Sequence, residues 1–147
     1  MVGIDEIYQR LSEIKQSIDY LQKISPKFLE DHDNFLLSRY YLQIILEAMF
    51  TIGNQLIANK KFRKPANYRD IITVLLEEKV ITRKLYTKLL PYVEMRNRLV
   101  HTYWKISKEE LLRISNSKNT YGYKLKVIVV SYAYISLNKR FLRLILL

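Results

Sequence analysis

Two side chains that can act on a phosphodiester stand five residues apart in this chain, Arg96 and His101. An arginine guanidinium is always charged and matches phosphate oxygens with a planar fork, whereas histidine takes and gives a proton near neutral pH. Together they would cleave RNA without a metal, because His101 moves the 2′-hydroxyl proton and Arg96 holds the charge that builds on phosphorus. Asn97, one helical turn before His101, would orient one of them. A lone His101 would more often be structural, but these neighbours favour catalysis.

The elements that must position these residues are predicted to be helices. The chain contains only three glycines and three prolines, so it has few residues that favour turns. Apolar residues recur every three or four positions, as they do in amphipathic helices. The expected helices cover residues 4 to about 24, about 34–59, about 68–78, about 83–103, and a further stretch after Ser107. Residues 1–115 are therefore predicted to form one all-α domain, an antiparallel bundle of four to five helices.

Three residues mark the helix ends near the histidine. Thr82 is a candidate N-cap, and Ser107 with Glu110 fits a capping box. Pro91 lies inside the predicted helix and indicates a kink or a late start there.

The predicted helix that carries His101 has two apolar stripes at a turn of about 100° per residue. The stripe expected to face the core comprises Tyr86, Leu89, Val93, Val100 and Trp104. The second stripe comprises Ile81, Leu85, Tyr92, Met95, Leu99 and Tyr103. Two stripes need two partners, and the second partner is either another helix of the bundle or a second copy of the chain. We expect a homodimer through Leu85, Met95 and Leu99. Because Arg96 and His101 lie roughly 140° apart around one helix, a second copy with its His101 near the two-fold axis would also complete the site.

The charge balance predicts an anionic partner. The formal net charge is +11, and nucleic acid is the commonest partner of such a chain. The candidates for RNA contact are Lys60, Lys61, Arg63, Lys64 and Arg98, although a solvated loop explains the first four equally well. Residues 116–147 contain no acid and are basic and apolar. Their pattern fits either a buried helix or a strand, and we expect a helix that packs on the same domain.

The composition of the chain argues against several other classes of protein. The chain has no cysteine, which excludes disulfides and thiolate metal sites. We expect no metal and no cofactor, since His32 between Asp31 and Asp33 is best interpreted as a solvated loop. No signal peptide and no uncharged apolar span of membrane length is evident, so the expected location is the cytoplasm.

The string RNRLVHTYW, residues 96–104, resembles the HEPN superfamily and within it the HepT group, which carries R-N-x-[LV]-V-H-x-Y-W. The resemblance extends upstream through RYYLQIILEAMFTIGNQLIA and NYRDIITVLLEEKVI and covers roughly residues 1–115. It implies a dimeric helical bundle with metal-independent endoribonuclease activity, acting in a type VII-like toxin–antitoxin system on RNA such as tRNA. It further implies a cognate antitoxin, a minimal nucleotidyltransferase (MNT), which attaches AMP to Tyr103.

The same residues allow other interpretations. A non-catalytic nucleotide- or substrate-binding partner of a nucleotidyltransferase would use Arg96 and His101 to hold phosphate, and an inert helical dimer would use neither. Glu47 is better explained by an ion pair with Arg96, Arg98 or a lysine than by acid catalysis. Trp104 is expected in the core. On a helix that stays regular to Tyr103, the phenol would lie beside Arg96, seven residues earlier.

Overall fold

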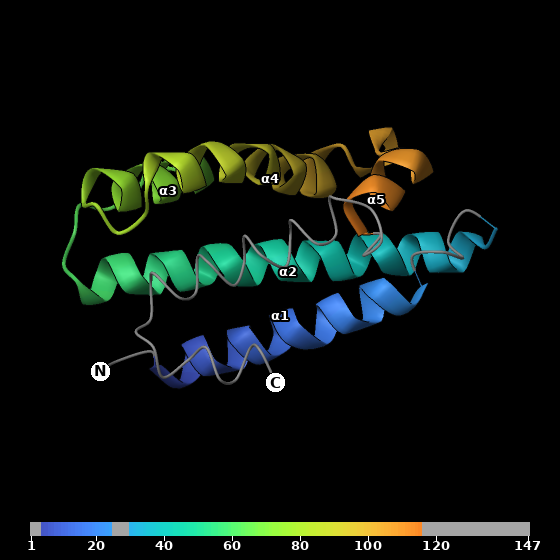
Figure 1. Ribbon diagram of the computed structural model, residues 1–147, viewed down its shortest axis with the longest axis horizontal. Helices are drawn as coiled ribbons and strands as arrows, with labels where there is room; N and C mark the ends of the chain where they lie inside the picture. Colours follow the sequence, from blue (N-terminus) through green and yellow to red (C-terminus); the bar gives the residue numbers. More distant parts are fainter. Residues whose placement is uncertain (1–3, 25–29, 116–147) are drawn as a thin grey trace.

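The computed structural model describes residues 4–24 and 30–115, and every regular element in these ranges is helical. In chain order the elements are α1 (Ile4–Ile24), α2 (His32–Asn59), α3 (Tyr68–Glu77), α4 (Arg83–His101), the 3-10 turn η1 (Tyr103–Lys105) and α5 (Lys108–Ser115). The predicted all-α bundle is confirmed (Figure 1). The prediction for residues 116–147 lies outside the described residues.

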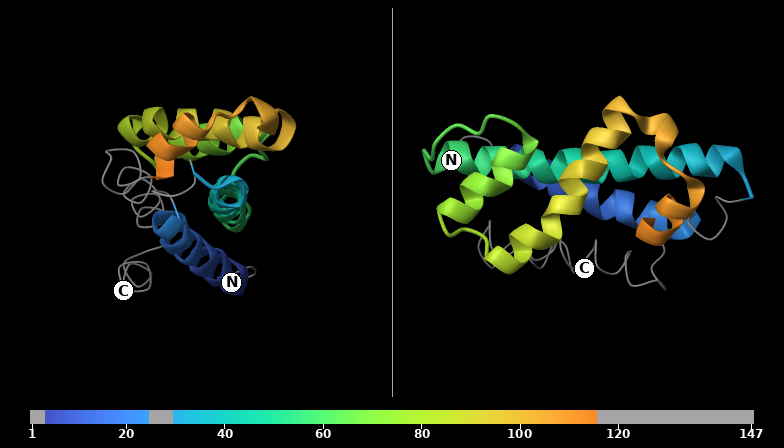
Figure 2. Two further views of the ribbon diagram at one scale, coloured as in Figure 1. Left: turned by 90° about the vertical axis from the view of Figure 1, so that its right-hand side faces the viewer. Right: turned by 90° about the horizontal axis from the view of Figure 1, so that it is seen from above.

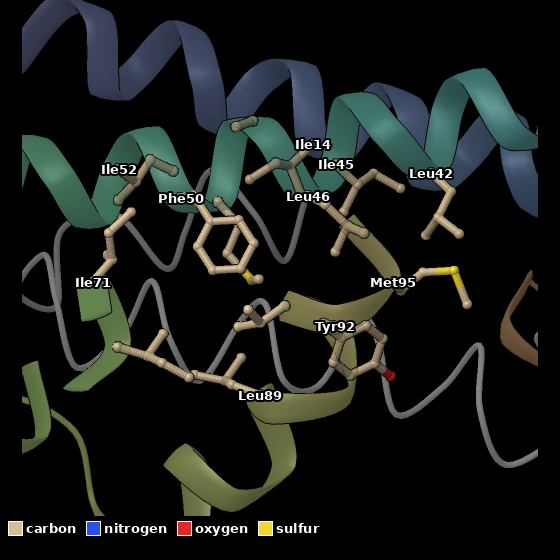
Figure 3. Close-up of a cluster of buried hydrophobic side chains, with 14 of the residues drawn as sticks. Ile14, Leu42, Ile45, Leu46, Phe50, Ile52, Ile71, Leu89, Tyr92 and Met95 are labelled. Atoms are coloured by element: carbon tan, nitrogen blue, oxygen red, sulfur yellow. The ribbon is translucent and has the colours of Figure 1, made fainter. Parts of the chain in front are cut away.

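Helix α2 is the central element of the bundle. It runs between α1 on one side and α3, α4 and α5 on the other (Figures 1 and 2). Leu42, Ile45 and Leu46 of α2 face Tyr92 and Met95 of α4 across the core (Figure 3). By length and composition alone α2 would suit a membrane span, yet half of its most apolar window is buried inside the bundle. Its apolar character is therefore explained by packing on two sides.

Short polar side chains begin the helices as the sequence predicts. Thr82 Oγ1 accepts a hydrogen bond from the Leu85 amide at 3.2 Å, and Ser107 Oγ accepts one from the Glu110 amide at 3.1 Å. Asp31 caps α2 in the same way, accepting from the Asp33 amide at 2.8 Å. Because this cap precedes the expected start at residue 34, His32 is the exposed first residue of α2 and not part of a loop.

Helix α4 differs from its prediction at one end. It is continuous from Arg83, so Pro91 does not delay its start. Pro91 lies on the exposed side of the helix, where water can replace the hydrogen bond that a proline removes. At its C-terminal end α4 stops at His101, two residues before the predicted end, and the chain enters η1.

The second apolar stripe of α4 is buried within this chain. Leu85, Met95 and Leu99 are at most 6% exposed, in a helix that packs against both α2 and α3. The predicted dimer interface through these three residues is therefore wrong. Trp104 is also misplaced by the prediction: it is 65% exposed, since the chain has left the helix before reaching it.

Candidate functional site

Arg96 lies on the buried side of α4 and is held by two other helices. Its Nε donates to Glu47 Oε1 of α2 at 2.7 Å, and its side chain is only 13% exposed. The guanidinium carbon lies 3.6 Å from the centroid of the Tyr68 ring of α3, a cation–π contact. The ion pair expected between Glu47 and a basic residue of this region is confirmed, with Arg96 as its partner.

Tyr68 completes this arrangement. Its hydroxyl donates to Glu47 Oε2 at 3.1 Å, while its ring meets the edge of Phe50 with centroids 5.3 Å apart. Burial raises the pKa of the Tyr68 phenol, and the Glu47 carboxylate raises that pKa further. The phenol therefore stays protonated at neutral pH and remains a donor to the carboxylate that orients Arg96.

His101 takes no part in these contacts among Arg96, Glu47 and Tyr68. It is the exposed last residue of α4, and within the described part of the chain its side chain forms no hydrogen bond or ion pair. Arg96 instead contacts α2 and α3. Because both residues belong to the regular part of α4, they lie roughly 140° apart around its axis, and we infer that one chain does not aim both at the same atom. Asn97 is exposed and its Oδ1 accepts from Arg96 Nη1 at 3.4 Å. Asn97 therefore contacts the arginine of the motif.

Tyr103 lies in η1 and is 48% exposed. Thr102 has φ −137° and ψ 39°, which takes the chain out of the α-helical path. The expected placement of the phenol beside Arg96 is therefore wrong. The cation near Tyr103 is Arg39 of α2, whose guanidinium carbon lies 5.0 Å from the ring centroid and whose Nη1 donates to the Tyr103 carbonyl oxygen at 3.2 Å.

Two of the predicted RNA-contact residues are engaged in ion pairs. Arg98 donates through Nη1 and Nη2 to the two oxygens of Glu110, which joins α4 to α5. Arg63 pairs with Asp70 at 2.7 Å and with Glu77 at 2.9 Å, which ties the loop after α2 to α3. Both contacts favour structural roles for these arginines.

The remaining predicted contacts, Lys60, Lys61 and Lys64, are exposed in the same loop. Along the bundle, this loop lies at the end opposite to the turn that follows α4 (Figures 1 and 2). The lysines are therefore remote from His101 within one chain.

Arg39 and Tyr68 are residues that sequence reasoning missed. For Arg39 a signal was available, because residues 34–59 contain only two charged side chains, Arg39 and Glu47. Each of these two contacts the RNRLVHTYW segment, Glu47 through Arg96 and Arg39 through Tyr103. Charged residues isolated in an apolar helix need partners, so both could have been singled out. Nothing in the sequence indicates which ring would cover Arg96.

The arrangement offers one pre-positioned cation, Arg96, and one imidazole, His101, that has no partner among the described residues. Among the described residues no three histidine, aspartate or glutamate side chains gather as metal ligands would. The chain matches the family model described as Ribonuclease HepT-like over residues 7–121. It therefore belongs to the HepT-like ribonuclease family.

Relatives with known names agree with this assignment. The chain is 27% identical to the mRNA nuclease HepT of Shewanella oneidensis over 75% of its own length and 85% of that protein. It is 28% identical to the tRNA nuclease HepT of Aphanizomenon flos-aquae over 66% of its length and 69% of that protein. With YutE of Bacillus subtilis it shares 31% identity over 52% of its length, and this match spans 54% of YutE.

Solved structures share the fold. A toxin–antitoxin structure with AMP-PNP superposes with a TM-score of 0.73 at 21% identity, covering 86% of this chain and 96% of the other. The tri-AMPylated HEPN toxin of Shewanella oneidensis in complex with MNT antitoxin gives a TM-score of 0.72 at 22% identity, with 84% and 92% covered. The described helices therefore form a HEPN-like bundle.

Proposed function

We propose that this chain is a toxin ribonuclease that cleaves RNA through Arg96 and His101. The observation that supports it most is the state of the two groups: Arg96 is oriented by Glu47 and Tyr68, and His101 is exposed and unpaired among the described residues. His101 removes the proton of the 2′-hydroxyl, whose oxygen attacks phosphorus. The bond to the 5′-oxygen breaks, and that oxygen takes a proton. Arg96 and Asn97 bind the phosphate oxygens.

We propose further that a second copy of the chain completes the site. Arg96 and His101 diverge in one chain, so a dimer with His101 of both copies near the two-fold axis would bring the groups to one phosphodiester. The stripe through Leu99 is not available for this contact. The first half of α2 instead exposes Leu36, Leu37 and Tyr40 close to Arg39, which contacts η1. This surface, which we call the Leu36–Tyr40 surface, is our proposed interface.

The proposed antitoxin is a nucleotidyltransferase of the MNT type, and the proposed acceptor of AMP is Tyr103. The exposed phenol oxygen attacks the α-phosphate of ATP, pyrophosphate leaves, and the phenol loses its proton. Each AMP brings a negative phosphate and a bulky nucleoside into the turn that follows His101, which excludes RNA by charge and by size. The relatives named above support this pairing, and a cytoplasmic location suits both RNA and ATP.

The two histidines of the chain provide the test of the nuclease. His101→Ala should lower RNA cleavage by about 10²–10⁴-fold, the usual contribution of a general acid or base. His32→Ala is the matched control, because His32 is also exposed at a helix end, and it should cleave at the wild-type rate. The products should carry a 2′,3′-cyclic phosphate, and EDTA should not stop the reaction.

Unchanged cleavage by His101→Ala, or a strict magnesium requirement, would contradict the mechanism. If wild-type protein binds RNA and never cleaves it, the non-catalytic phosphate-binding alternative takes its place. For the antitoxin, co-expression with the neighbouring nucleotidyltransferase should add AMP units to the intact mass. Those units should vanish in Tyr103→Phe. A neutralised toxin of unmodified mass would indicate inhibition by binding alone.

A further inference from the structure

A pair of cations lies on the aromatic side chains around Tyr103. The guanidinium carbon of Arg39 lies 5.2 Å from the centroid of the Phe35 ring and 5.0 Å from that of the Tyr103 ring. Lys108 Nζ, from the first turn of α5, lies 5.7 Å from the same Phe35 centroid. One ring thus gathers cations from two elements at the turn that follows His101.

These two cations have no anionic partner in the described part of the chain. The two arginines of the RNRLVHTYW segment, in contrast, each have a carboxylate: Arg96 pairs with Glu47, and Arg98 with Glu110. Arg39 donates only to the Tyr103 carbonyl oxygen among the described residues, although a guanidinium has five N–H donors. The unused donors of Arg39 and the ammonium of Lys108 can therefore take an anion.

The nearest acids in sequence do not neutralise the pair. The Asp31 carboxylate accepts the Asp33 amide at the start of α2, and neither residue forms an ion pair within the described ranges. Glu109 is exposed and Glu110 is committed to Arg98. An anion that approaches Tyr103 would therefore meet positive charge first.

We propose that Arg39 and Lys108 form a binding site for a phosphate group next to Tyr103. A planar guanidinium and an ammonium are the side chains that suit phosphate oxygens best. The phosphate belongs either to an RNA strand that enters toward His101 or to AMP carried near the Tyr103 oxygen. Only this choice of source rests on the proposed function. The site itself follows from the two unpaired cations.

The chain contains its own reporter for this site. Trp104 is its single tryptophan, 65% exposed in η1 and packed edge-on against Tyr103 with centroids 5.3 Å apart. Its emission can be followed while wild-type protein is titrated with inorganic phosphate, AMP, adenosine, or a 2′-O-methyl RNA hexamer, which lacks the hydroxyl needed for cleavage. We expect saturable changes with the phosphate-bearing probes and none with adenosine.

Charge-removing variants assign the response to its residues. Arg39→Gln and Lys108→Gln should each raise the dissociation constant about tenfold, as expected for loss of a hydrogen bond to a charged group. For the hexamer, each should lower the slope of log Kd against log salt by about 0.7. Lys84→Gln is the matched control, because Lys84 is exposed in the first turn of α4, and it should bind like wild type.

The set of probes that bind identifies the source of the phosphate group. A response to AMP alone assigns the site to the nucleotide, and a response to the hexamer alone assigns it to the RNA backbone. The proposal is overturned if no phosphate-bearing probe gives a saturable change, if adenosine binds as well as AMP, or if Lys84→Gln weakens binding as much as Arg39→Gln. Arg39→Gln also removes the hydrogen bond to the Tyr103 carbonyl oxygen and could disturb η1. In that case the effect of Lys108→Gln on binding decides whether the site exists. RNA cleavage is not measured, so failure of the nuclease proposal would leave these results interpretable.

Discussion

Arg96 is constrained before any substrate arrives. Its Nε donates to Glu47, its guanidinium carbon lies over the Tyr68 ring, and its Nη1 donates to Asn97. Holding a side chain in one rotamer ahead of binding removes that entropy cost from the binding step. The sequence could identify Arg96 and a pairing for Glu47, because charged residues near a core need partners. It could not identify Tyr68, since a ring 28 positions away becomes a neighbour only through the packing of α3.

Two variants of Tyr68 separate its hydroxyl from its ring. Tyr68→Phe loses the hydrogen bond to Glu47 and should lower the free energy of unfolding by about 0.5–1.5 kcal/mol. Tyr68→Leu also loses the cation–π contact with Arg96 and should cost about 0.5–2 kcal/mol more. Urea denaturation followed by circular dichroism measures both. Equal stability of the two variants would mean that the ring contributes nothing to holding Arg96.

At the scale of elements, periodicity and capping residues predicted α1 to α4 to within two residues at each end, and they predicted the start of α5. The errors concern α4. Apolar residues spaced three and four apart identify the apolar faces of a helix but do not say which partner covers each face. The stripe through Leu99 was therefore assigned to a second chain, although it is buried within this one. The end of α4 at His101 could not be predicted from the sequence either, because apolar and aromatic residues continue the helical pattern beyond it. Because α4 ends there, Tyr103 and Trp104 lie in η1 and not on the helix where they were expected.

The loop between α2 and α3 should be sensitive to acid. Arg63 and the Ala66 amide, 2.8 Å from Asp70 Oδ2, lower the pKa of the Asp70 carboxyl to about 2. Since this folded-state pKa lies below the usual unfolded value of about 3.9, the stabilisation is complete above pH 4. It is lost as pH falls toward 2. Glu77, whose pKa Arg63 also lowers, acts in the same direction.

Amide hydrogen exchange in residues 60–70 measures this effect. In wild type, the loop's protection should decline between pH 4 and 2 after correction for intrinsic exchange. In Asp70→Asn it should be low already at pH 5 and change little over that range. Identical pH profiles for the two proteins would show that the Arg63–Asp70 pair does not hold the loop.

At the scale of the whole molecule, the position of α2 decides where function can lie. It lies between α1 and the layer of α3, α4 and α5 (Figure 2). Its first half nevertheless keeps Leu36, Leu37 and Tyr40 exposed. Isolated exposed apolar residues are ordinary on protein surfaces, but a group on one helix next to a candidate site indicates a contact surface. Arg39, in the same half of α2, contacts Tyr103, so assembly and phosphate binding would meet at one end of the bundle.

Charged substitutions distinguish the Leu36–Tyr40 surface from the buried stripe as the dimer interface. Tyr40 is 57% exposed, and Tyr40→Glu should leave the helical circular dichroism and melting temperature near wild type while shifting the protein from dimer to monomer. Leu99 is 4% exposed, and Leu99→Glu should instead destabilise the fold by several kcal/mol, because it buries an unpaired carboxylate. Sedimentation velocity at micromolar concentration and thermal melts measure the two effects.

If the active site needs both copies, Tyr40→Glu should also lose RNA cleavage with its fold intact, and cleavage should return as protein concentration rises. A folded, monomeric Leu99→Glu protein would restore the buried stripe as the interface, and a wild-type monomer that cleaves RNA at full rate would remove the need for a second copy.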